Sequence, residues 1–188
     1  MLGFALKRLF TKPSNFIKWK IRRKRIMAIE IERRFLVVDD SWRGQTSGIL
    51  YRQGYLYFKE DGVLRIRIAG ENGFITVKVR ENDLSTLEYE YEIPKEDAED
   101  MLARLCEHTP VEKIRYRISY AGLIWEVDEF RGANEGLVVA EIELEDEKQK
   151  FDLPPWAGKE VTDQKKYLNA YLYKNPFNNW RLEAKQPY

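Results

Sequence analysis

The sequence predicts a mainly β (α+β) protein, and the expected architecture is a closed eight-stranded antiparallel β-barrel tunnel with flanking helices. Three observations lead to this prediction. Apolar and polar residues alternate with a period of two in eight segments between residues 29 and 145. Short connections containing Gly, Asn or Asp separate most of these segments, which favours antiparallel hairpins over helical crossovers. Eight antiparallel strands are also enough to close a barrel around a small ligand.

The predicted strands follow one another along the chain, with one helix between the fifth and the sixth. They cover residues 29–37, 50–58, 63–69, 74–80, 85–93, 112–120, 123–130 and 137–145. Turn-forming sequences separate them at residues 60–62, 71–73, 81–83, 121–122 and 132–134.

Two helices are predicted beside the strands. The first follows Pro94, which is tolerated at a helix start, and the acidic residues after it favour a first helical turn. Apolar residues then recur on one face until Thr109 and Pro110 end the helix. A second helix is predicted over residues 163–172, after a loop at residues 152–158.

The composition excludes several protein classes. Of 188 residues, 44% are hydrophobic and 13% are aromatic, which allows a sizeable core and excludes global disorder. No run approaches the roughly 18 apolar residues that a membrane span needs. The single cysteine, Cys106, excludes a disulfide framework and a structural zinc site and favours a cytoplasmic location. Cys106 and the single histidine, His108, belong to the first predicted helix and its end, where a structural role is more common than a catalytic one.

The net charge of +1 hides an uneven distribution. Residues 1–26 contain nine Lys or Arg residues and no acid, whereas the remaining 162 residues contain 23 basic and 31 acidic residues, a net charge of −8. We therefore divide the chain into a basic N-terminal tail, residues 1–26, and a single domain, residues 27–188. Nucleic-acid binding is not expected for the acidic domain, because nucleic-acid binding depends on positive charge.

Three interpretations of the tail stay open. In the first, Met27 is the functional start, or the tail is a disordered segment with no role of its own. In the second, its interleaved basic and aromatic residues bind an anionic surface, either a membrane or a nucleic acid. In the third, the tail is an organelle address. A secretory signal is disfavoured, because the apolar residues of the tail are scattered.

Charged residues dominate the polar positions of the predicted strands. Eight basic and ten acidic side chains fall on matching faces of seven strands. Three of these strands are purely basic, three are purely acidic and only the first is mixed. One interpretation is an open sheet with its charged face in water. The other, which the sorting of signs by strand favours, is a barrel with its charges inward.

A barrel with inward charges suits metal-dependent chemistry on a polyanion. Arg and Lys would hold an oligophosphate, Arg through bidentate contacts. Carboxylates would hold Mg²⁺ or Mn²⁺, hard cations that bridge carboxylates to phosphates. Other chemistries are disfavoured, because the chain has no GxxxxGK[ST] loop and only one histidine for a metal site or a catalytic triad.

Several short motifs occur in a fixed order along the chain. They are EIERR at 30–34, RQGYL at 52–56, LRIR at 64–67, EYEYEIP at 88–94, KIRYR at 113–117, WEVD at 125–128, AEIEL at 140–144 and GKEVT at 158–162. In this order they resemble the CYTH domains, the triphosphate tunnel metalloenzymes, over roughly residues 28–178. The first motif resembles the ExExK signature of that family, with Arg34 in the place of the lysine. Arginine keeps the charge of lysine but is longer, planar and forked.

The resemblance implies an eight-stranded antiparallel tunnel whose ends helices can cover, and it implies roles for individual residues. The implied metal ligands, for Mg²⁺ or Mn²⁺, are Glu30, Glu32, Glu141 and Glu143. The implied phosphate-binding residues are Arg34, Arg65, Arg67, Lys78, Lys113, Arg115 and Arg117. Glu90 and Asp128 are the catalytic candidates, which would orient water or hold a second metal ion.

The resemblance also implies an activity, the metal-dependent hydrolysis of inorganic tripolyphosphate to pyrophosphate and phosphate. The expected binding partner is thus a small polyanionic substrate. Nucleoside or thiamine triphosphatase and adenylate cyclase activities are alternatives within the same family. A non-catalytic oligophosphate-binding module and a plain structural sheet domain are alternatives of other classes. The sequence favours neither Mg²⁺ nor Mn²⁺ and sets no oligomeric state.

Overall fold

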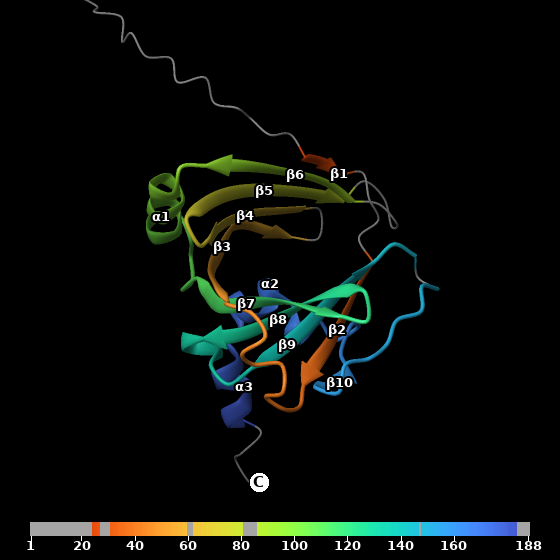
Figure 1. Cartoon of the computed structure of the whole chain (residues 1–188). Coiled ribbons are helices and arrows are strands. Elements are labelled where there is room, and N and C mark those ends of the chain that lie inside the picture. Colours follow the sequence, from red (N-terminus) through yellow and green to blue (C-terminus); the bar gives the residue numbers. More distant parts are fainter. Residues whose placement is uncertain (1–23, 27–30, 60–61, 81–85, 147, 184–188) are drawn as a thin grey trace, which may run out of the picture.

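One antiparallel sheet of ten strands and a few short helices make up the described part of the chain (Figure 1). The computed structural model describes residues 24–26, 31–59, 62–80, 86–146 and 148–183. The strands are β1 (Lys24–Ile26), β2 (Ile31–Val37), β3 (Ile49–Lys59), β4 (Gly62–Ala69), β5 (Asn72–Arg80), β6 (Thr86–Ile93), β7 (Val111–Tyr120), β8 (Leu123–Arg131), β9 (Val138–Leu144) and β10 (Ala157–Glu160). The helices are α1 (Lys95–Arg104), α2 (Asn169–Lys174) and α3 (Phe177–Glu183), with the short 3-10 helices η1 (Gly132–Asn134) and η2 (Lys165–Tyr167). Within the described ranges, every helix is too short or too polar to cross a membrane.

All eight predicted strands are present, as β2 to β9, and their ends lie within two residues of the predicted ones. Two further strands were not predicted. β1 belongs to the basic tail and pairs with β6. β10 begins inside the predicted loop at residues 152–158, so that prediction is wrong at its end. β10 has four residues and pairs with β2 in an irregular register. Such a strand is too short to show a period-two pattern.

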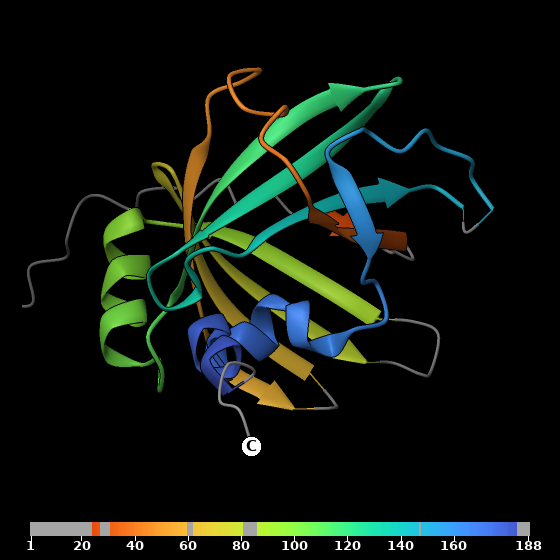
Figure 2. The ribbon, with the colours of Figure 1, turned by 90° about the horizontal axis from the view of Figure 1, so that it is seen from below.

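The sheet curls so that its two halves face each other (Figures 1 and 2). The strand order is β1-β6-β5-β4-β3-β7-β8-β9-β2-β10, and every pair is antiparallel. β1 and β10 are the two edges of this order, and no pairing joins them among the described residues. The predicted closed barrel of eight strands is therefore not confirmed, because the sheet has ten strands and its hydrogen-bonded order is open.

The apolar core lies on the outer side of the curled sheet. Trp125 and Val127 of β8 are fully buried, and they pack with Trp42 and Trp156 from the segments that flank the sheet. On the other half of the sheet, α1 covers a second cluster, made of Ala98, Leu102, Ile66 and Ile68. Because side chains alternate across a strand, the charged residues between these apolar positions point to the inner side.

The turns follow the chemistry of their residues. Ala121 and Gly122, with φ of 48° and 83°, join β7 to β8 as a two-residue hairpin turn. Positive φ at both central residues matches the right-handed twist of the two strands. The predicted turn at residues 132–134 forms η1. The predicted turns at residues 60–62 and 81–83 fall wholly or largely outside the described residues.

The helices differ more from the prediction than the strands do. α1 confirms the first helix, but it ends at Arg104, so Cys106 follows the helix instead of belonging to it. The predicted single helix over residues 163–172 is wrong. Leu168 has an extended backbone, with φ of −70° and ψ of 137°, and this residue separates η2 from α2. α3 was not predicted.

Candidate active site

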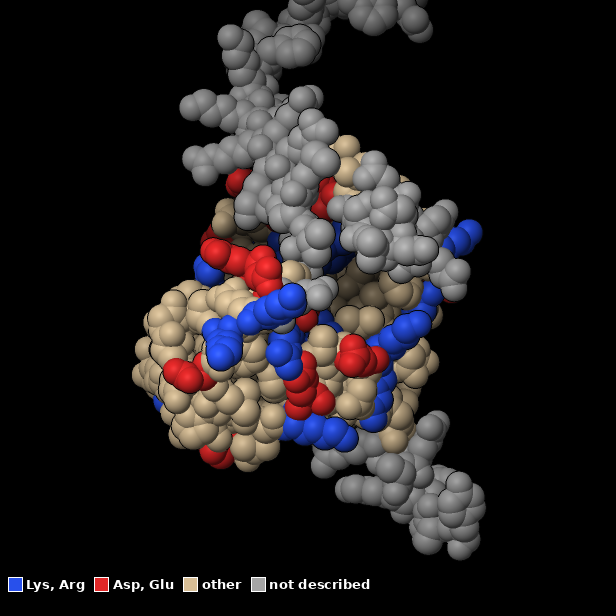
Figure 3. Space-filling view, turned by 90° about the vertical axis from the view of Figure 1, so that its right-hand side faces the viewer, with Lys and Arg blue, Asp and Glu red and all other residues tan. Residues whose placement is uncertain are grey.

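A charged cavity lies between the two halves of the sheet. Its volume is about 220 Å³, and every strand from β2 to β9 contributes to its lining, together with α2. The lining residues are Glu32, Tyr51, Gln53, Arg65, Arg67, Lys78, Glu88, Glu90, Lys113, Arg115, Glu126, Glu141, Glu143 and Asn169. Figure 3 shows the surface hollowed on this side of the molecule, with Lys and Arg side chains next to Asp and Glu side chains. The curl of the sheet thus brings charges from distant strands into one space.

A second cavity, of about 170 Å³, adjoins the first. The two share Glu32, Glu126, Glu141 and Glu143, and the second adds Arg117 and Ile124. The four carboxylates therefore lie where the two cavities meet. Arg117 is the more exposed partner of Glu126, with 65% of its side chain accessible, so it lies near the outside.

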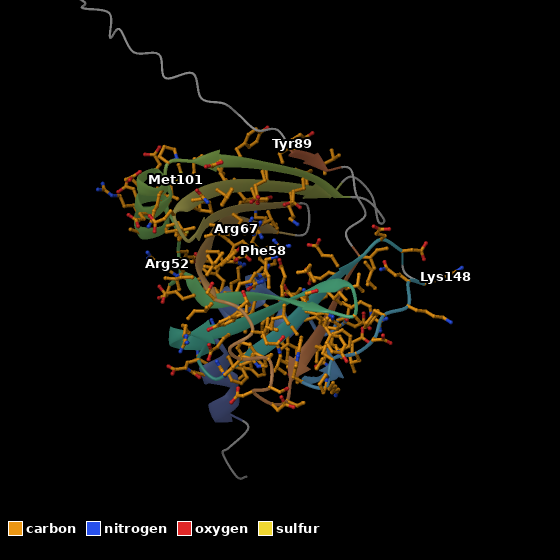
Figure 4. All side chains as sticks on the ribbon, in the orientation of Figure 1. Arg52, Phe58, Arg67, Tyr89, Met101 and Lys148 are labelled. Atoms are coloured by element: carbon orange, nitrogen blue, oxygen red, sulfur yellow. The ribbon has the colours of Figure 1, made fainter. Side chains whose placement is uncertain are left out.

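The basic side of the main cavity comes from β4, β5 and β7. Arg65 and Arg67 are two residues apart on β4, so both side chains point inward, and Figure 4 shows Arg67 between the two halves of the sheet. The Nε atoms of both arginines are buried and have no hydrogen-bond partner among the described residues. Lys78 of β5 pairs with Glu88 at 2.6 Å. Buried unpaired donors at a cavity wall are donors available to an anion.

Glu90 holds these two arginines in place. Its Oε2 accepts hydrogen bonds from Arg67 at 2.8 Å, from Arg65 at 3.3 Å and from Thr76 at 2.8 Å. Burial alone would raise the pKa of Glu90, but Arg67, Thr76 and Arg65 lower it below its ordinary value. Glu90 is therefore a carboxylate that accepts bonds from its neighbours while it also lines the cavity.

Asp128 plays the same part beneath Lys113 and Arg115, but from deeper in the structure. It is 0% exposed and is not among the described residues that line either cavity. Lys113 forms an ion pair with Asp128, and Arg115 Nε donates to Asp128 Oδ1 at 2.6 Å. Burial, together with the charge of Arg115, lowers the pKa of Lys113. Arg115 also reaches Glu141, at 2.7 Å, and so connects the basic and the acidic sides.

The acidic side is formed by β2 and β9. Glu32 lies directly opposite Glu143, and Arg34 directly opposite Glu141. Burial, and then the charge of Glu141, raise the pKa of Glu32 to about 7. Burial would also raise the pKa of Glu141, but Lys113, Arg115 and Arg34 lower it to about 2. The two carboxylates thus differ in the direction of their pKa shifts, upward for Glu32 and downward for Glu141.

Arg34 lies beneath these acids instead of facing the cavity. The residue is 7% exposed and is absent from the described lining of both cavities. Its Nε donates to Glu141 Oε1 at 2.9 Å, and its Nη2 pairs with Glu32. Its guanidinium therefore joins two carboxylates of the acidic side.

The structure brings together most of the residues that the sequence singles out. The main cavity is lined by nine of them, namely Glu32, Arg65, Arg67, Lys78, Glu90, Lys113, Arg115, Glu141 and Glu143. Arg117 lines the second cavity. Arg34 and Asp128 are buried next to the lining, and Glu30 lies outside the described residues.

Five further lining residues were not predicted as site residues. Glu88 and Glu126 lie on the predicted charged faces, and this signal would have found them. Tyr51 and Gln53 alternate on β3, and the Tyr51 ring centroid lies 5.8 Å from Arg67 Cζ and 5.4 Å from Arg115 Cζ. Asn169 comes from α2, distant in sequence from the strands, and carried no signal.

The acidic side has the donor chemistry for a divalent cation. Among the described residues, no three His, Cys, Asp or Glu residues are already close enough to hold a metal ion. Glu32 and Glu141, however, are near enough for the charge of one to shift the pKa of the other. Carboxylate oxygens with an excess of negative charge are the ligands that Mg²⁺ and Mn²⁺ prefer. The residues present therefore fit such an ion, which would draw the carboxylates together.

The sequence and the fold match proteins of one family. A model of the CYTH domain matches residues 28–171. A protein named inorganic triphosphatase from Acetivibrio thermocellus is 48% identical over 155 residues, which cover 82% of this chain and 99% of the relative. One of the same name from Nitrosomonas europaea is 41% identical over 147 residues, which cover 76% of this chain and 95% of the relative. A crystal structure of an inorganic triphosphatase, 37% identical, superposes with a TM-score of 0.61 and covers 78% of this chain and 95% of that one. This chain therefore belongs to the CYTH family.

Proposed function

We propose that this protein hydrolyses inorganic tripolyphosphate to pyrophosphate and phosphate in the main cavity. The observation that carries the proposal is the cavity itself, where basic side chains from three strands and carboxylates from four others line a space of about 220 Å³. The relatives named inorganic triphosphatase support the same activity, because 99% and 95% of their own lengths match this chain.

The finer architecture that we propose is a sheet closed around this cavity into a tunnel. β1 pairs with β6 at one end of the strand order, and β2 pairs with β9 near the other end. Ile26 of β1 and Ile31 of β2 are five residues apart, and a fully extended chain of that length spans at most about 18 Å. This short connection supports closure, because it links β1, at one edge of the sheet, to β2, which lies next to the other edge.

In this proposal the basic side chains bind the phosphates. Arg65 and Arg67 offer their unpaired Nε donors from one half of the sheet. Lys113 and Arg115 face them from the other half, and Lys78 lies beside them. Bidentate arginine contacts suit phosphate oxygens, and a lysine adds a point charge. Arg117, at the second cavity, would meet the end of a bound chain near the outside.

The acids would hold Mg²⁺ or Mn²⁺ next to the bound phosphates. The proposed ligands are Glu32, Glu141 and Glu143, joined by Glu30 from the segment outside the described residues. When bound, such an ion neutralises charge that develops on the phosphate oxygens. The carboxylates themselves keep the acidic side free of phosphate until the ion is present, since like charges repel.

The reaction needs no covalent intermediate. Water attacks the terminal phosphorus in line with the bridging oxygen, the bond from phosphorus to that oxygen breaks and pyrophosphate leaves, while the protons of the water pass to the released phosphate and to solvent. Arg65, Arg67 and Arg115 would stabilise the charge on the transferred group. Glu90 lines the cavity and would orient the water through the same carboxylate that holds the arginines. Asp128 acts through Lys113 and Arg115, because it lies beneath them and fully buried.

The lining favours an inorganic substrate over a nucleotide. Among the described lining residues of the main cavity, Tyr51 is the one aromatic side chain, and Arg67 and Arg115 both lie within 6 Å of its ring centroid. A nucleoside or thiamine triphosphate would need an apolar or aromatic surface for its base. The ring of Tyr51 is already in contact with these two arginines, so it does not provide such a surface.

The deciding experiment measures phosphate release from tripolyphosphate, ATP and thiamine triphosphate, each with Mg²⁺ and with Mn²⁺. We expect release from tripolyphosphate to exceed that from the other two, to require a divalent ion, and to be lost in Glu32→Gln. Equal release by the wild-type protein and Glu32→Gln would contradict the assignment. Tight binding of tripolyphosphate without release under any metal would identify a binding module instead, and a cyclic product from ATP would identify a cyclase.

The proposal extends to the whole chain. Residues 27–188 would form the single catalytic domain, placed in the cytoplasm, where a lone cysteine stays reduced. For residues 1–26 the alternatives given above remain, a start at Met27 or a tail with no role of its own, contact with anionic surfaces, and an organelle address. A version that begins at Met27 lacks β1 together with the rest of the tail, so comparing it with the full chain, in the same assay, tests whether catalysis needs either of them.

A further inference from the structure

Arg34 is a cation built into the acidic side of the site, and its surroundings differ from those of the other basic residues. The other cations named above, from Arg65 to Arg117, belong to the lining of one of the two cavities, whereas Arg34 is 7% exposed and absent from the described lining of both. Two corners of its guanidinium are directed at carboxylates, Nε at Glu141 and Nη2 at Glu32. Its other N–H donors belong to a side chain that is buried beneath the lining, so they are not presented to the cavity.

The backbone of Arg34 is fixed from the opposite side. Its N–H donates to Thr162 Oγ1 at 3.0 Å, and its carbonyl oxygen accepts from the Val161 N–H at 2.7 Å. The Thr162 hydroxyl in turn donates to Glu160 Oε1 at 2.7 Å, and Glu160 pairs with Arg33 through two of its donors. The segment after β10 therefore holds Arg34 in one place, so the direction of its planar fork is set by the fold.

A fixed fork between two carboxylates determines where those carboxylates point. Glu32 and Glu141 line both cavities, and both are among the ligands proposed above for the divalent ion. Each uses the Oε1 oxygen for Arg34, and Oε2 of Glu141 meets Arg115. Residues that hydrogen-bond to metal-ligating carboxylates orient them and tune metal affinity.

We infer that Arg34 is a positioning residue that holds Glu32 and Glu141 in a geometry suited to a divalent cation, and that it does not bind the substrate phosphates. This inference rests on the proposed function, because it concerns the ion that the same acids would hold. It replaces the phosphate contact that the resemblance implied for Arg34. An arginine suits this role better than a lysine, because the lysine ammonium lacks the two coplanar donors that hold two carboxylates at once.

The direction in which the affinity for a divalent cation changes when Arg34 is removed distinguishes a positioning role from a simple effect of its charge. If Arg34 acted only as a nearby positive charge, its removal would strengthen the binding of a divalent cation, because like charges repel. If it positions the two acids, its removal weakens that binding. If it binds phosphate, its removal raises the KM for tripolyphosphate and does not weaken the binding of the cation in the absence of substrate.

The experiment is calorimetric titration of Mn²⁺ into the full-length, substrate-free protein. We expect Arg34→Met to weaken Mn²⁺ binding about 10-fold or more, which is the usual cost of losing a residue that orients a metal ligand. Arg34→Lys should bind with an intermediate affinity and an unchanged KM for tripolyphosphate. The matched control is Arg67→Met, a cation of the phosphate-binding wall, which should raise that KM without weakening Mn²⁺ binding.

Several results would overturn the inference. One is an Arg34→Met protein that binds Mn²⁺ as tightly as the wild type, or more tightly, and another is a wild-type chain that binds no Mn²⁺. If Arg34→Met does not fold, as judged by circular dichroism, Arg34→Lys decides alone. A raised KM with unchanged Mn²⁺ affinity in that variant contradicts positioning. If the wild type binds Mn²⁺ but releases no phosphate, the proposed function fails, while the Mn²⁺ affinities still decide the role of Arg34.

Discussion

The basic and the acidic sides of the cavity are built in the same way with opposite signs. Beneath Lys113 and Arg115 lies a buried anion, Asp128, and beneath Glu32 and Glu141 lies a buried cation, Arg34. In each case the residues that face the cavity carry one charge and their support carries the other. A charged wall of a single sign would repel itself, and the buried counter-charge offsets that repulsion.

The two sides differ in how deeply they are buried. The side chains of Lys113 and Asp128 are 2% and 1% exposed, whereas those of Arg34 and Glu141 keep 9% each and that of Glu32 keeps 36%. The basic pair therefore forms part of the folded core, and the acidic pair lies at the junction of the two cavities. This difference indicates that the pair of Lys113 and Asp128 serves folding as well as binding, while Glu32 can respond to solvent and ions.

The largest expected effect is on the basic side. Asp128→Asn removes the buried anion and leaves two cations without their partner, so we expect the free energy of unfolding to fall by about 3–5 kcal/mol. Urea denaturation measures it. The matched control is Asp40→Asn, which breaks an exposed pair with Arg43 and should cost less than about 1 kcal/mol. Similar losses for the two variants would show that Asp128 is not a special support.

A second effect concerns the wall that faces the substrate. Arg67→Met removes an unpaired donor and a charge, so we expect the KM for tripolyphosphate to rise about 10- to 100-fold, in line with a charged hydrogen bond of about 1.5–3 kcal/mol. Steady-state kinetics measures it, and Arg131→Met, at a partly exposed surface pair, is the control. An unchanged KM would place Arg67 outside the substrate site.

The smallest effect, a dependence on pH, belongs to the acidic side. The folded protein keeps the Glu32 proton up to a pKa of about 7, while the ordinary value is 4.5. Between these values the folded state binds more protons than the unfolded chain, so this group lowers stability as pH rises through that window. In metal-free buffer, Glu32→Gln should therefore gain in melting temperature over the wild type as pH rises from 4.5 to 7. A difference between the two proteins that does not change with pH would contradict the raised pKa.

These two sides also show what the sequence can and cannot predict. Alternation placed nearly every charged residue on the correct face, because which side of a strand a residue occupies is a local, period-two property. Alternation carries no information on how deeply a side chain is buried. From the sequence, Arg34 and Asp128 therefore could not be distinguished from Arg65 and Glu90, which line the cavity. Their burial depends on what covers them, and this is decided by strands and loops distant in sequence.

The same limit explains the elements that the sequence missed. β10 is four residues long and is defined by its pairing with β2, and Asn169 reaches the cavity from α2. Neither has a periodic pattern of its own. The family motifs predicted which strands carry the site, and the three-dimensional contacts decide which residues face the cavity and which residues support them.

The central claim is that cavity-facing cations bind phosphate, cavity-facing acids bind the metal ion, and buried counter-charges bind neither. A crystal structure with Mn²⁺ and a tripolyphosphate analogue whose bridging oxygens are replaced by nitrogen tests this most directly. We predict phosphate oxygens at Arg65 and Arg67, Mn²⁺ at Glu32 and Glu141, and Arg34 still bound to the two acids. A phosphate bound by Arg34, or an analogue outside the main cavity, would contradict the account.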